Sequence, residues 1–294
     1  MQEEVPYNLF HLITGLDGAL AIRSCDGDLL FAQSPGGTPW LWVDRDLPEF
    51  ERQDKLAQLI EFLDDPSLKG ICSEPRTAEL FAELYSAGYD SGLKFCMDME
   101  AYACPRVHVP TGVNGTIRPS RMEDREAVAV FLAGFSEDGY GITVEPESQM
   151  AEAGKMIRSG GLYVLEVDGV PQSMARIAHR APRHGRINAV FTPRGERGKG
   201  YAGAVVSALC SMLLGEGLVP MLYADLANPS SNRLYQKIGF VKSGKSGISV
   251  LDESHRRTEE LTAAGKQRYT DGGDVSERGM ETPWQALCNG CLMR

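Results

Sequence analysis

The sequence has no apolar run close to the ~18 residues that a membrane-spanning helix needs. The apolar stretch 9–13, after an acidic Met-Gln-Glu-Glu start, is too short for the core of a signal peptide. Positive charge is also scarce, because 30 Lys and Arg face 40 Asp and Glu and give a net charge of −10. This balance disfavours nucleic acid and anionic membranes as partners and favours a cationic or amine-bearing one.

The cysteines lack the pattern of a disulfide framework. There are seven, an odd number, and most of them (Cys25, Cys72, Cys96, Cys104 and Cys210) lie in or beside apolar runs, which is typical of buried free thiols. Cys288 and Cys291 form one CxxC pair, and without a second pair they cannot complete a four-ligand zinc site. We therefore expect no metal and a reducing, cytoplasmic location.

Composition and hydrophobic periodicity predict a folded α/β (α+β) protein with a central mixed sheet flanked by helices. The chain has 294 residues, of which 43% are apolar and 24% charged, as in ordinary globular proteins. In the second half, alternation and turn signals predict strands at 116–118, 161–168, 172–179, 186–192, 219–225, 240–243 and 247–251. Apolar spacing there predicts helices at 124–135, 149–157, 201–214 and 230–238.

The first hundred residues repeat this order of elements. Strands are predicted at 19–24, 29–33, 39–44, 68–73 and 95–104, and helices at 52–63 and 77–87. We therefore expect two similar halves, residues 1–110 and 113–251, joined by a linker around 105–115. Residues 252–294 form a charged tail with few apolar residues, which we expect to be mobile.

A loop rich in glycine and arginine separates the strand 186–192 from the helix 201–214. It reads Thr-Pro-Arg-Gly-Glu-Arg-Gly-Lys-Gly from Thr192 to Gly200. Glycine lets the backbone approach a ligand closely, and the free N–H groups of the following helix favour a phosphate. Arg194, Arg197 and Lys199 add positive charge in an acidic protein. The loop is therefore a candidate phosphate cradle.

Two familiar phosphate loops can be compared with this cradle. A P-loop is excluded, because Gly198-Lys199 is followed by glycine and not by serine or threonine. Gly198, Gly200 and Gly203 do match the dinucleotide pattern G-x-G-x-x-G, and Asp225 follows at a strand end. That reading is the weaker one, because the loop starts several residues after its strand and the preceding strands are linked by hairpins.

The segment Arg197-x-x-Gly200-x-Ala202 resembles the pyrophosphate-binding motif of the GNAT superfamily of acyl-CoA-dependent N-acyltransferases. The later stretch 228–240, with Asn228, Tyr235 and Gly239-Phe240, resembles a downstream motif of the same family. The resemblance covers about 135 residues and implies a GNAT fold, with a degenerate GNAT-like domain in front. That first half has Asp44–Pro48, acidic and without glycine, where its cradle belongs, so it should not bind CoA.

The resemblance also implies roles for individual residues. The acyl thioester would lie between two splayed parallel strands, 186–192 and 219–225, and an amine would attack it directly. Tyr235 would be the general acid that protonates the departing thiolate. Asn228 and Asn232 would hydrogen-bond acetyl-CoA or fix their own helix. The other expected acetyl-CoA contacts are Val190, Phe191, Thr192, Arg197, Gly198, Lys199, Gly200, Tyr201, Ala202 and Gly203.

The general base is less well defined. The strand 186–192 carries Asn188 and no carboxylate, although family members often place one there. The alternatives are Asp225, a water chain, or Glu145 and Glu147; Asp225 could equally be a turn residue. We expect His184, in a turn, to be solvated.

The sequence therefore predicts an N-acyltransferase that moves an acetyl group from acetyl-CoA to an amine, more readily a small molecule than a protein. One alternative is a sensor or scaffold that binds acyl-CoA without turnover. Another, much weaker, is a nicotinamide oxidoreductase.

Overall fold

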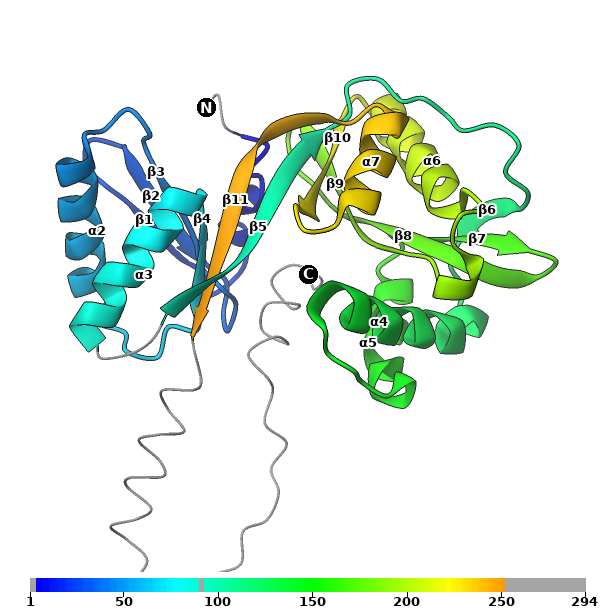
Figure 1. Ribbon diagram of the computed structural model, residues 1–294, viewed down its shortest axis with the longest axis horizontal. Helices are drawn as coiled ribbons and strands as arrows, with labels where there is room; N and C mark the ends of the chain where they lie inside the picture. Colours follow the sequence, from blue (N-terminus) through cyan, green and yellow to red (C-terminus); the bar gives the residue numbers. More distant parts are fainter. Residues whose placement is uncertain (1–3, 90–92, 252–294) are drawn as a thin grey trace, which may run out of the picture. The chain divides into compact units, whose positions relative to one another are not determined.

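The computed structural model describes residues 4–89 and 93–251 (Figure 1). The predicted mobile tail, with its CxxC pair, lies outside the described residues. None of the described helices is long and apolar enough to cross a membrane. The chain forms two compact units. We call residues 4–8 and 99–244 the C-terminal unit, and the described residues of 9–98 and 245–251 the N-terminal unit.

The C-terminal unit is built on a mixed sheet in the order β6-β7-β8-β9-β10-β5, antiparallel except for the parallel pair β9–β10. Its strands are β6 (Thr116–Pro119), β7 (Leu162–Val167), β8 (Val170–Arg180), β9 (His184–Phe191), β10 (Val219–Asp225) and the end of β5 (Leu93–Ala103). Its α-helices are α4 (Arg125–Tyr140), α5 (Met150–Arg158), α6 (Tyr201–Gly215) and α7 (Pro229–Ile238). Short 3₁₀ helices lie at Met122–Asp124 (η1), Pro146–Gln149 (η2) and Arg194–Glu196 (η3).

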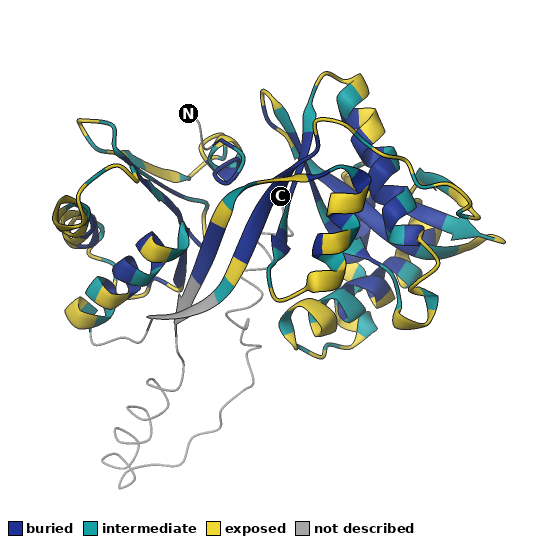
Figure 2. Cartoon of the chain, turned by 45° about the horizontal axis from the view of Figure 1, so that its top comes forward, coloured by how far each residue is buried: buried dark blue, intermediate teal, exposed yellow. Residues whose placement is uncertain are grey.

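Helices cover both faces of this sheet (Figure 1). Alternate residues of the strands pack against α6 and α7 on one face; Ile177, Ile187 and Leu222 belong to that core. The residues between them face α4 and α5, where Val164 and Met174 pack. Figure 2 shows buried residues along the strands of the unit and along the helices beside them. The sheet therefore has two distinct sides, and side-chain alternation decides which side each strand residue serves.

The N-terminal unit is smaller and repeats the order of elements that runs from β7 to α7 in the C-terminal unit. It contains a short helix α1 (Leu9–Ile13), β1 (Leu20–Arg23), β2 (Leu29–Gln33), β3 (Trp40–Val43), α2 (Glu49–Leu63), β4 (Gly70–Ser73) and α3 (Pro75–Tyr89). The pairs β1–β2 and β2–β3 are antiparallel and β3–β4 is parallel, as for β7–β8, β8–β9 and β9–β10. Its core is formed by α2 and α3 against the strands.

The last strand of each sequence half pairs in the other half's sheet. β5 follows α3 in the sequence, yet its residues Met99–Ala103 pair with β10. β11 (Val241–Leu251) follows α7, and its residues Gly247–Val250 pair with β4. The compact units therefore do not end where the expected halves 1–110 and 113–251 end, because hydrophobic patterning reveals a strand without revealing its partner.

The predicted α/β fold class is confirmed, with three local differences. The strands expected at 240–243 and 247–251 are one strand, β11, which runs through Gly244 at φ +140°. α1 was not predicted. Cys72, Cys104 and Cys210 are buried free thiols as expected, but Cys25 is exposed because it lies in the turn between β1 and β2.

Candidate active site

The parallel strands β9 and β10 form a fork. They pair at His184–Val219, Gly185–Pro220 and Arg186–Met221, and along the described residues of both strands their ladder stops there. Each strand then follows its outer neighbour, β9 with β8 and β10 with β5. The predicted splay between 186–192 and 219–225 is thus present. The backbone N–H and C=O groups of β9 beyond Arg186 and of β10 beyond Met221 do not pair with one another.

A β-bulge lies on the β9 arm of this fork. Met174 pairs with Phe191 and Arg176 with Asn188, so Ala189 and Val190 together oppose a single residue of β8. Ala189 has φ +49°, a left-handed conformation that is uncommon for alanine and typical of strained functional backbone. A bulge turns backbone groups out of the ladder. The backbone around Val190 is therefore a better candidate to pair with a ligand than that of a regular strand.

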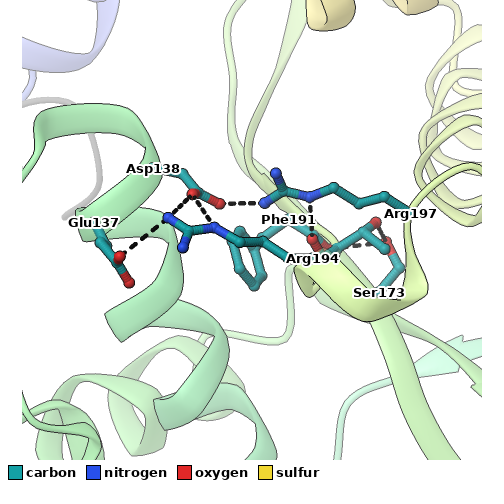
Figure 3. Close-up of polar contacts among 7 residues, drawn as sticks. Glu137, Asp138, Ser173, Phe191, Arg194 and Arg197 are labelled. Carbon is teal, nitrogen blue, oxygen red and sulfur yellow. Dashed lines mark hydrogen bonds and ion pairs between the residues drawn. The ribbon is translucent and has the colours of Figure 1, made fainter.

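The expected contacts at the end of β9 are partly occupied by the protein itself. The Ser173 hydroxyl donates to the carbonyl of Phe191 at 2.9 Å and lies 2.8 Å from the Thr192 hydroxyl. The Arg197 Nε–H donates to the carbonyl of Thr192 at 2.9 Å. These contacts, drawn in Figure 3, fix the strand end and the start of the cradle.

The cradle has the backbone geometry expected of an anion site. Gly198 and Gly200 have φ +81° and +85°, a region that favours glycine. Gly200 is the N-cap of α6, no side chain caps the helix, and its first turn, from Tyr201 to Ala204, contains no acidic residue. The N–H groups of Tyr201, Ala202 and Gly203 therefore have no intrahelical acceptor, and they carry the positive end of the helix dipole.

Close packing limits what the cradle can contain. A Cβ added to Gly200 would lie 3.0 Å from Cγ2 of Val113, and one added to Gly203 would lie 3.2 Å from Cδ1 of Leu234. Tyr201 is buried, and the Lys199 ammonium lies 6.0 Å from the centre of its ring. The loop thus leaves little room for a side chain at Gly200 or Gly203.

Each cation of the cradle is paired with an acid. Arg194 binds Glu137 at 3.0 Å and Asp138 at 2.7 Å, and Arg197 also donates to Asp138 (Figure 3). Burial raises the pKa of Asp138, but the hydrogen bonds from the two arginines outweigh burial and leave that pKa below its usual range. The Lys199 ammonium donates to Glu196 at 2.7 Å. The two acids of α4 were not predicted, because nothing in their sequence spacing points to a loop more than 50 residues later.

Tyr235 lies on α7, on the α6/α7 side of the sheet. Its ring packs against Tyr102 at 6.4 Å and Phe240 at 5.7 Å, and 7% of the residue is exposed. Burial raises the pKa of the Tyr235 phenol well above its ordinary value. Like an ordinary phenol, the hydroxyl is protonated near neutral pH and can serve as a proton donor, and burial makes it a weaker acid.

The other polar residues near α7 hold that helix in place. The Asn228 side chain caps it by accepting from the Ser231 N–H at 3.1 Å. Asn232 donates to the carbonyls of Asp225 and Asn228, each at 2.7 Å, and accepts from the Tyr102 hydroxyl at 2.8 Å. Of the two roles expected for these asparagines, the geometry shows helix fixation; a contact with acetyl-CoA stays a prediction.

The three carboxylates considered as general bases, and His184, lie in different surroundings. Asp225 is half-buried at the end of β10 and accepts from the Ala227 N–H at 2.8 Å, so it acts as a turn residue. Glu145 and Glu147 flank or lie in η2 and are exposed. His184 is part of β9, not of a turn, and its Nδ1 lies 3.5 Å from the buried Glu4 carboxylate, so it is not solvated as expected. The structure brings none of these three acids to the fork by a contact that it shows among the described residues.

Comparison with known proteins agrees with this geometry. Residues 161–247 match the family model of FR47-like proteins. The structure is similar to a GCN5-related N-acetyltransferase from Kribbella flavida (14% identity, TM-score 0.53, 86% of this chain and 98% of that one). It is also similar to one from Sphaerobacter thermophilus (15%, 0.52, 83% and 84%) and to a GNAT acetyltransferase from Colwellia psychrerythraea (13%, 0.51, 79% and 84%). No curated protein matches at a significant level.

These likenesses first establish the class of fold: the C-terminal half has the GNAT fold, as the sequence resemblance implied. More particularly, the stretch from β7 into β11, which contains the fork, the cradle and α7, is the part that matches the FR47-like family model.

Proposed function

We propose that the protein is an acyl-CoA-dependent N-acyltransferase whose active site is the fork, the cradle and Tyr235 of the C-terminal unit. The observation that supports this most is the uncapped, acid-free N-terminus of α6, which follows two left-handed glycines at the end of a splayed strand. Such an N-terminus suits a pyrophosphate on physical grounds. Acetyl-CoA, when bound, supplies an acyl group activated as a thioester.

The chain's own residues would divide the work. The N–H groups of Tyr201, Ala202 and Gly203 would bind the pyrophosphate, with Arg197 and Lys199 adding positive charge. The bulged backbone near Val190 would donate to the carbonyl oxygen, which gains negative charge during attack. Tyr235, whose phenol is protonated near neutral pH, would give its proton to the departing thiolate.

A non-catalytic acyl-CoA sensor is a second candidate. It is favoured by β9, which carries Asn188 and no carboxylate to receive the proton of an ammonium acceptor. The buried, protonated Tyr235 favours the enzyme, because a sensor has no leaving group to protonate.

Calorimetry with acetyl-CoA tests the shared part of both proposals. The wild type should bind in the micromolar range, and Gly200→Leu should lose measurable binding, because it forces a left-handed leucine against Val113. Gly195→Ala is the matched control in the same loop; its added Cβ meets nothing within 4 Å and its binding should be unchanged. A wild type that binds NAD and not acetyl-CoA would overturn the proposal in favour of a dinucleotide loop at Gly198, Gly200 and Gly203.

An amine screen then separates enzyme from sensor. Release of free CoA thiol with any amine, reduced in Tyr235→Phe, supports the transferase. Tight acetyl-CoA binding with no thiol release from any amine supports the sensor.

A further inference from the structure

The bulge on β9 combines an extra residue with an unfavourable backbone conformation. Ala189 and Val190 together oppose the single residue Ala175 of β8, and Ala189 has φ +49°. In the described part of the chain, the other non-glycine residues with positive φ are Asp64, at the end of α2, and Asp168, in the turn between β7 and β8. Aspartate in such places adopts this conformation readily, whereas alanine inside a strand does not. A strained conformation of this kind persists only where the surrounding contacts hold it.

The side chain of Ser173, on β8, contacts β9 directly after the bulge. Its buried hydroxyl donates to the Phe191 carbonyl at 2.9 Å (Figure 3). Because a serine hydroxyl has one proton, the Thr192 hydroxyl is the donor in the 2.8 Å contact between the two hydroxyls. Ser173 therefore joins two successive residues of the chain that leaves the bulge.

The ring of Phe191 is held independently of this hydrogen bond. It lies 5.9 Å from the ring of Phe131 on α4 and belongs to the core on the α4/α5 side. A Cβ added to Gly134 would lie 2.5 Å from Cζ of Phe191, so α4 leaves the ring little room to shift. A change at Ser173 would therefore act on the backbone after the bulge and leave the ring packed.

The bulge carries the backbone on which the proposed function depends. Val190, whose N–H would donate to the thioester oxygen, directly precedes Phe191. A donor of this kind is effective when it is already aimed at the place where negative charge develops. A misplacement of about 1 Å can lower a reaction rate by about 100-fold. The pyrophosphate would be bound elsewhere, at α6, so a loosened bulge should affect the rate more than the affinity for acetyl-CoA.

We propose, given the acyltransferase function above, that Ser173 is a positioning residue for acyl transfer. It holds the strained bulge at Ala189 and Val190, and so directs the Val190 N–H at the thioester carbonyl. Ser173 acts through the Phe191 carbonyl and makes no contact with the substrate. Its hydroxyl therefore contributes to kcat, and acetyl-CoA binds equally well without it.

The N-terminal unit supplies a matched control. Ser73 on β4 is also fully buried, and its hydroxyl donates to the Leu41 carbonyl of the neighbouring strand β3 at 2.7 Å. Ser73→Ala and Ser173→Ala each remove one such hydroxyl, so they should lower the midpoint of urea unfolding by similar amounts. Ser173→Thr keeps the hydroxyl and should restore most of what Ser173→Ala loses. If the threonine variant does not fold, the two alanine variants still decide.

Hydrogen exchange in the ligand-free protein tests whether Ser173 holds the bulge. In Ser173→Ala, the amides of residues 189–192 should exchange roughly tenfold faster than in the wild type, as the loss of one hydrogen bond implies. Ser73→Ala should leave the exchange of these amides unchanged. Equal exchange at 189–192 in Ser173→Ala and the wild type would overturn the proposal, whether or not the chain binds acyl-CoA.

Kinetics tests the effect on acyl transfer. With an acceptor found in the amine screen, Ser173→Ala should lower kcat by about 10- to 100-fold. The KM for the amine and the calorimetric Kd for acetyl-CoA should stay close to their wild-type values. Ser73→Ala should change none of the three. A higher KM or Kd with kcat unchanged would overturn the proposal, because it would assign Ser173 to binding.

Infrared spectroscopy measures the hydrogen bond to the carbonyl itself. Acetyl-CoA labelled with carbon-13 at the acetyl carbonyl should show a lower C=O stretching frequency when bound to the wild type than when free. Ser173→Ala should return that frequency toward the free value, and Ser73→Ala should not. The same bound frequency in Ser173→Ala and the wild type would overturn the proposal.

The positioning role and the acyltransferase function fail in different ways. A wild type that does not bind acetyl-CoA contradicts the acyltransferase, and hydrogen exchange then still shows whether Ser173 holds the bulge. If acetyl-CoA binds and no amine turns over, the infrared comparison takes the place of kcat. A wild-type complex whose carbonyl frequency equals that of free acetyl-CoA would overturn the role proposed for the bulge and for Ser173.

Discussion

The helices α3 and α7 hold the same place in the two units and begin in the same way. The Glu74 carboxylate accepts from the Thr77 N–H at 3.1 Å, just as the Asn228 side chain accepts from Ser231, and a proline follows each capping residue. Six residues after that proline, α3 has Phe81 and α7 has Tyr235, both buried. One hydroxyl therefore distinguishes two otherwise matching positions.

The turns before α2 and α6 differ more. Asp44–Pro48 is short and acidic, and the first turn of α2 carries Glu49 and Glu51, which complement the helix dipole and would repel a phosphate. The turn before α6 is long, glycine-rich and basic, and the first turn of that helix has no acid. Neither helix has a side-chain cap, so the two connections differ in charge: acidic before and within the first turn of α2, and basic before an acid-free first turn of α6.

The parallel strands also differ. In the N-terminal unit, the buried Ser73 hydroxyl on β4 donates to the Leu41 carbonyl on β3 at 2.7 Å and ties the two strands together. In the C-terminal unit, β9 and β10 part beyond Arg186 and Met221. The two units thus share a topology, and the C-terminal unit differs by an open fork, a basic turn and one phenol, the three features on which the proposed site depends.

The largest effect should follow removal of residues 1–110, which tests whether the C-terminal half is self-sufficient. The deletion takes away β5, which pairs with Met221–Asp225, and the Tyr102 hydroxyl that binds Asn232. We expect the remaining chain to show no cooperative unfolding transition by circular dichroism. A truncated chain that unfolds cooperatively and binds acetyl-CoA like the intact protein would show that β5 is dispensable.

Tyr235→Phe makes α7 resemble α3 at its distinguishing position. Loss of the proton donor should lower kcat by about 100-fold or more, with acetyl-CoA affinity unchanged. Tyr85→Phe on α3 is the matched control: its buried hydroxyl donates to the Asp65 carbonyl at 2.7 Å and accepts from Leu68 at 3.1 Å. That change should cost about 1 kcal/mol of unfolding free energy and leave kcat intact. Equal kcat in Tyr235→Phe and wild type would remove Tyr235 from the mechanism.

The two units should also differ in how far their stability depends on a buried carboxylate at low pH. Asp124, buried in the C-terminal unit, is held by Arg118 at 2.7 Å, and the hydrogen bond from that guanidinium lowers the pKa of Asp124. A lowered pKa adds stability that is complete above about pH 4 and is lost as the pH falls through the folded-state pKa. Asp124→Asn should lower the free energy of unfolding by about 1–3 kcal/mol at pH 7. It should also make that free energy fall less steeply as the pH drops below about 4.

The matched change in the N-terminal unit is Asp26→Asn, at an exposed carboxylate bound to Lys55 at 2.5 Å. It should hardly alter the acid unfolding curve of the protein. Urea unfolding from pH 7 to pH 2.5 compares the two variants. Identical curves for both would contradict a special acid sensitivity of the C-terminal unit.

The smallest effect should come from the acids that hold the cradle arginines. Asp138→Asn removes the acid that binds Arg197 and leaves Arg194 paired with Glu137 alone. Since exposed ion pairs contribute about 0–1 kcal/mol, acetyl-CoA affinity should rise by no more than about fivefold. Asp26→Asn serves again as the control and should leave the affinity unchanged. Calorimetry at low and moderate salt measures both; a fall in affinity for Asp138→Asn would mean that the acid orders the arginines for binding.

Periodicity predicted most strands and helices of both units, and the bounds of β2 and β10 agree with the predicted 29–33 and 219–225. The cradle glycines could be found because positive φ restricts residue choice. The pairing of Asp138 with two arginines could not, because it depends on where α4 lies over the sheet. The exchange of β5 and β11 was missed for the same reason: alternation marks a strand but not its neighbour.

This exchange has a consequence for synthesis of the chain. Gly70–Ser73 in β4 pairs with residues 247–250, so during translation one edge of β4 waits for a partner about 175 residues later. At about 5–20 residues per second, that wait lasts roughly 10 to 35 s. All four residues of β4, Gly-Ile-Cys-Ser, are buried in the folded protein. While one edge of this strand is unpaired, it can serve as a template for aggregation. Recovery of soluble protein should therefore depend on translation speed and on chaperones that bind exposed strand edges.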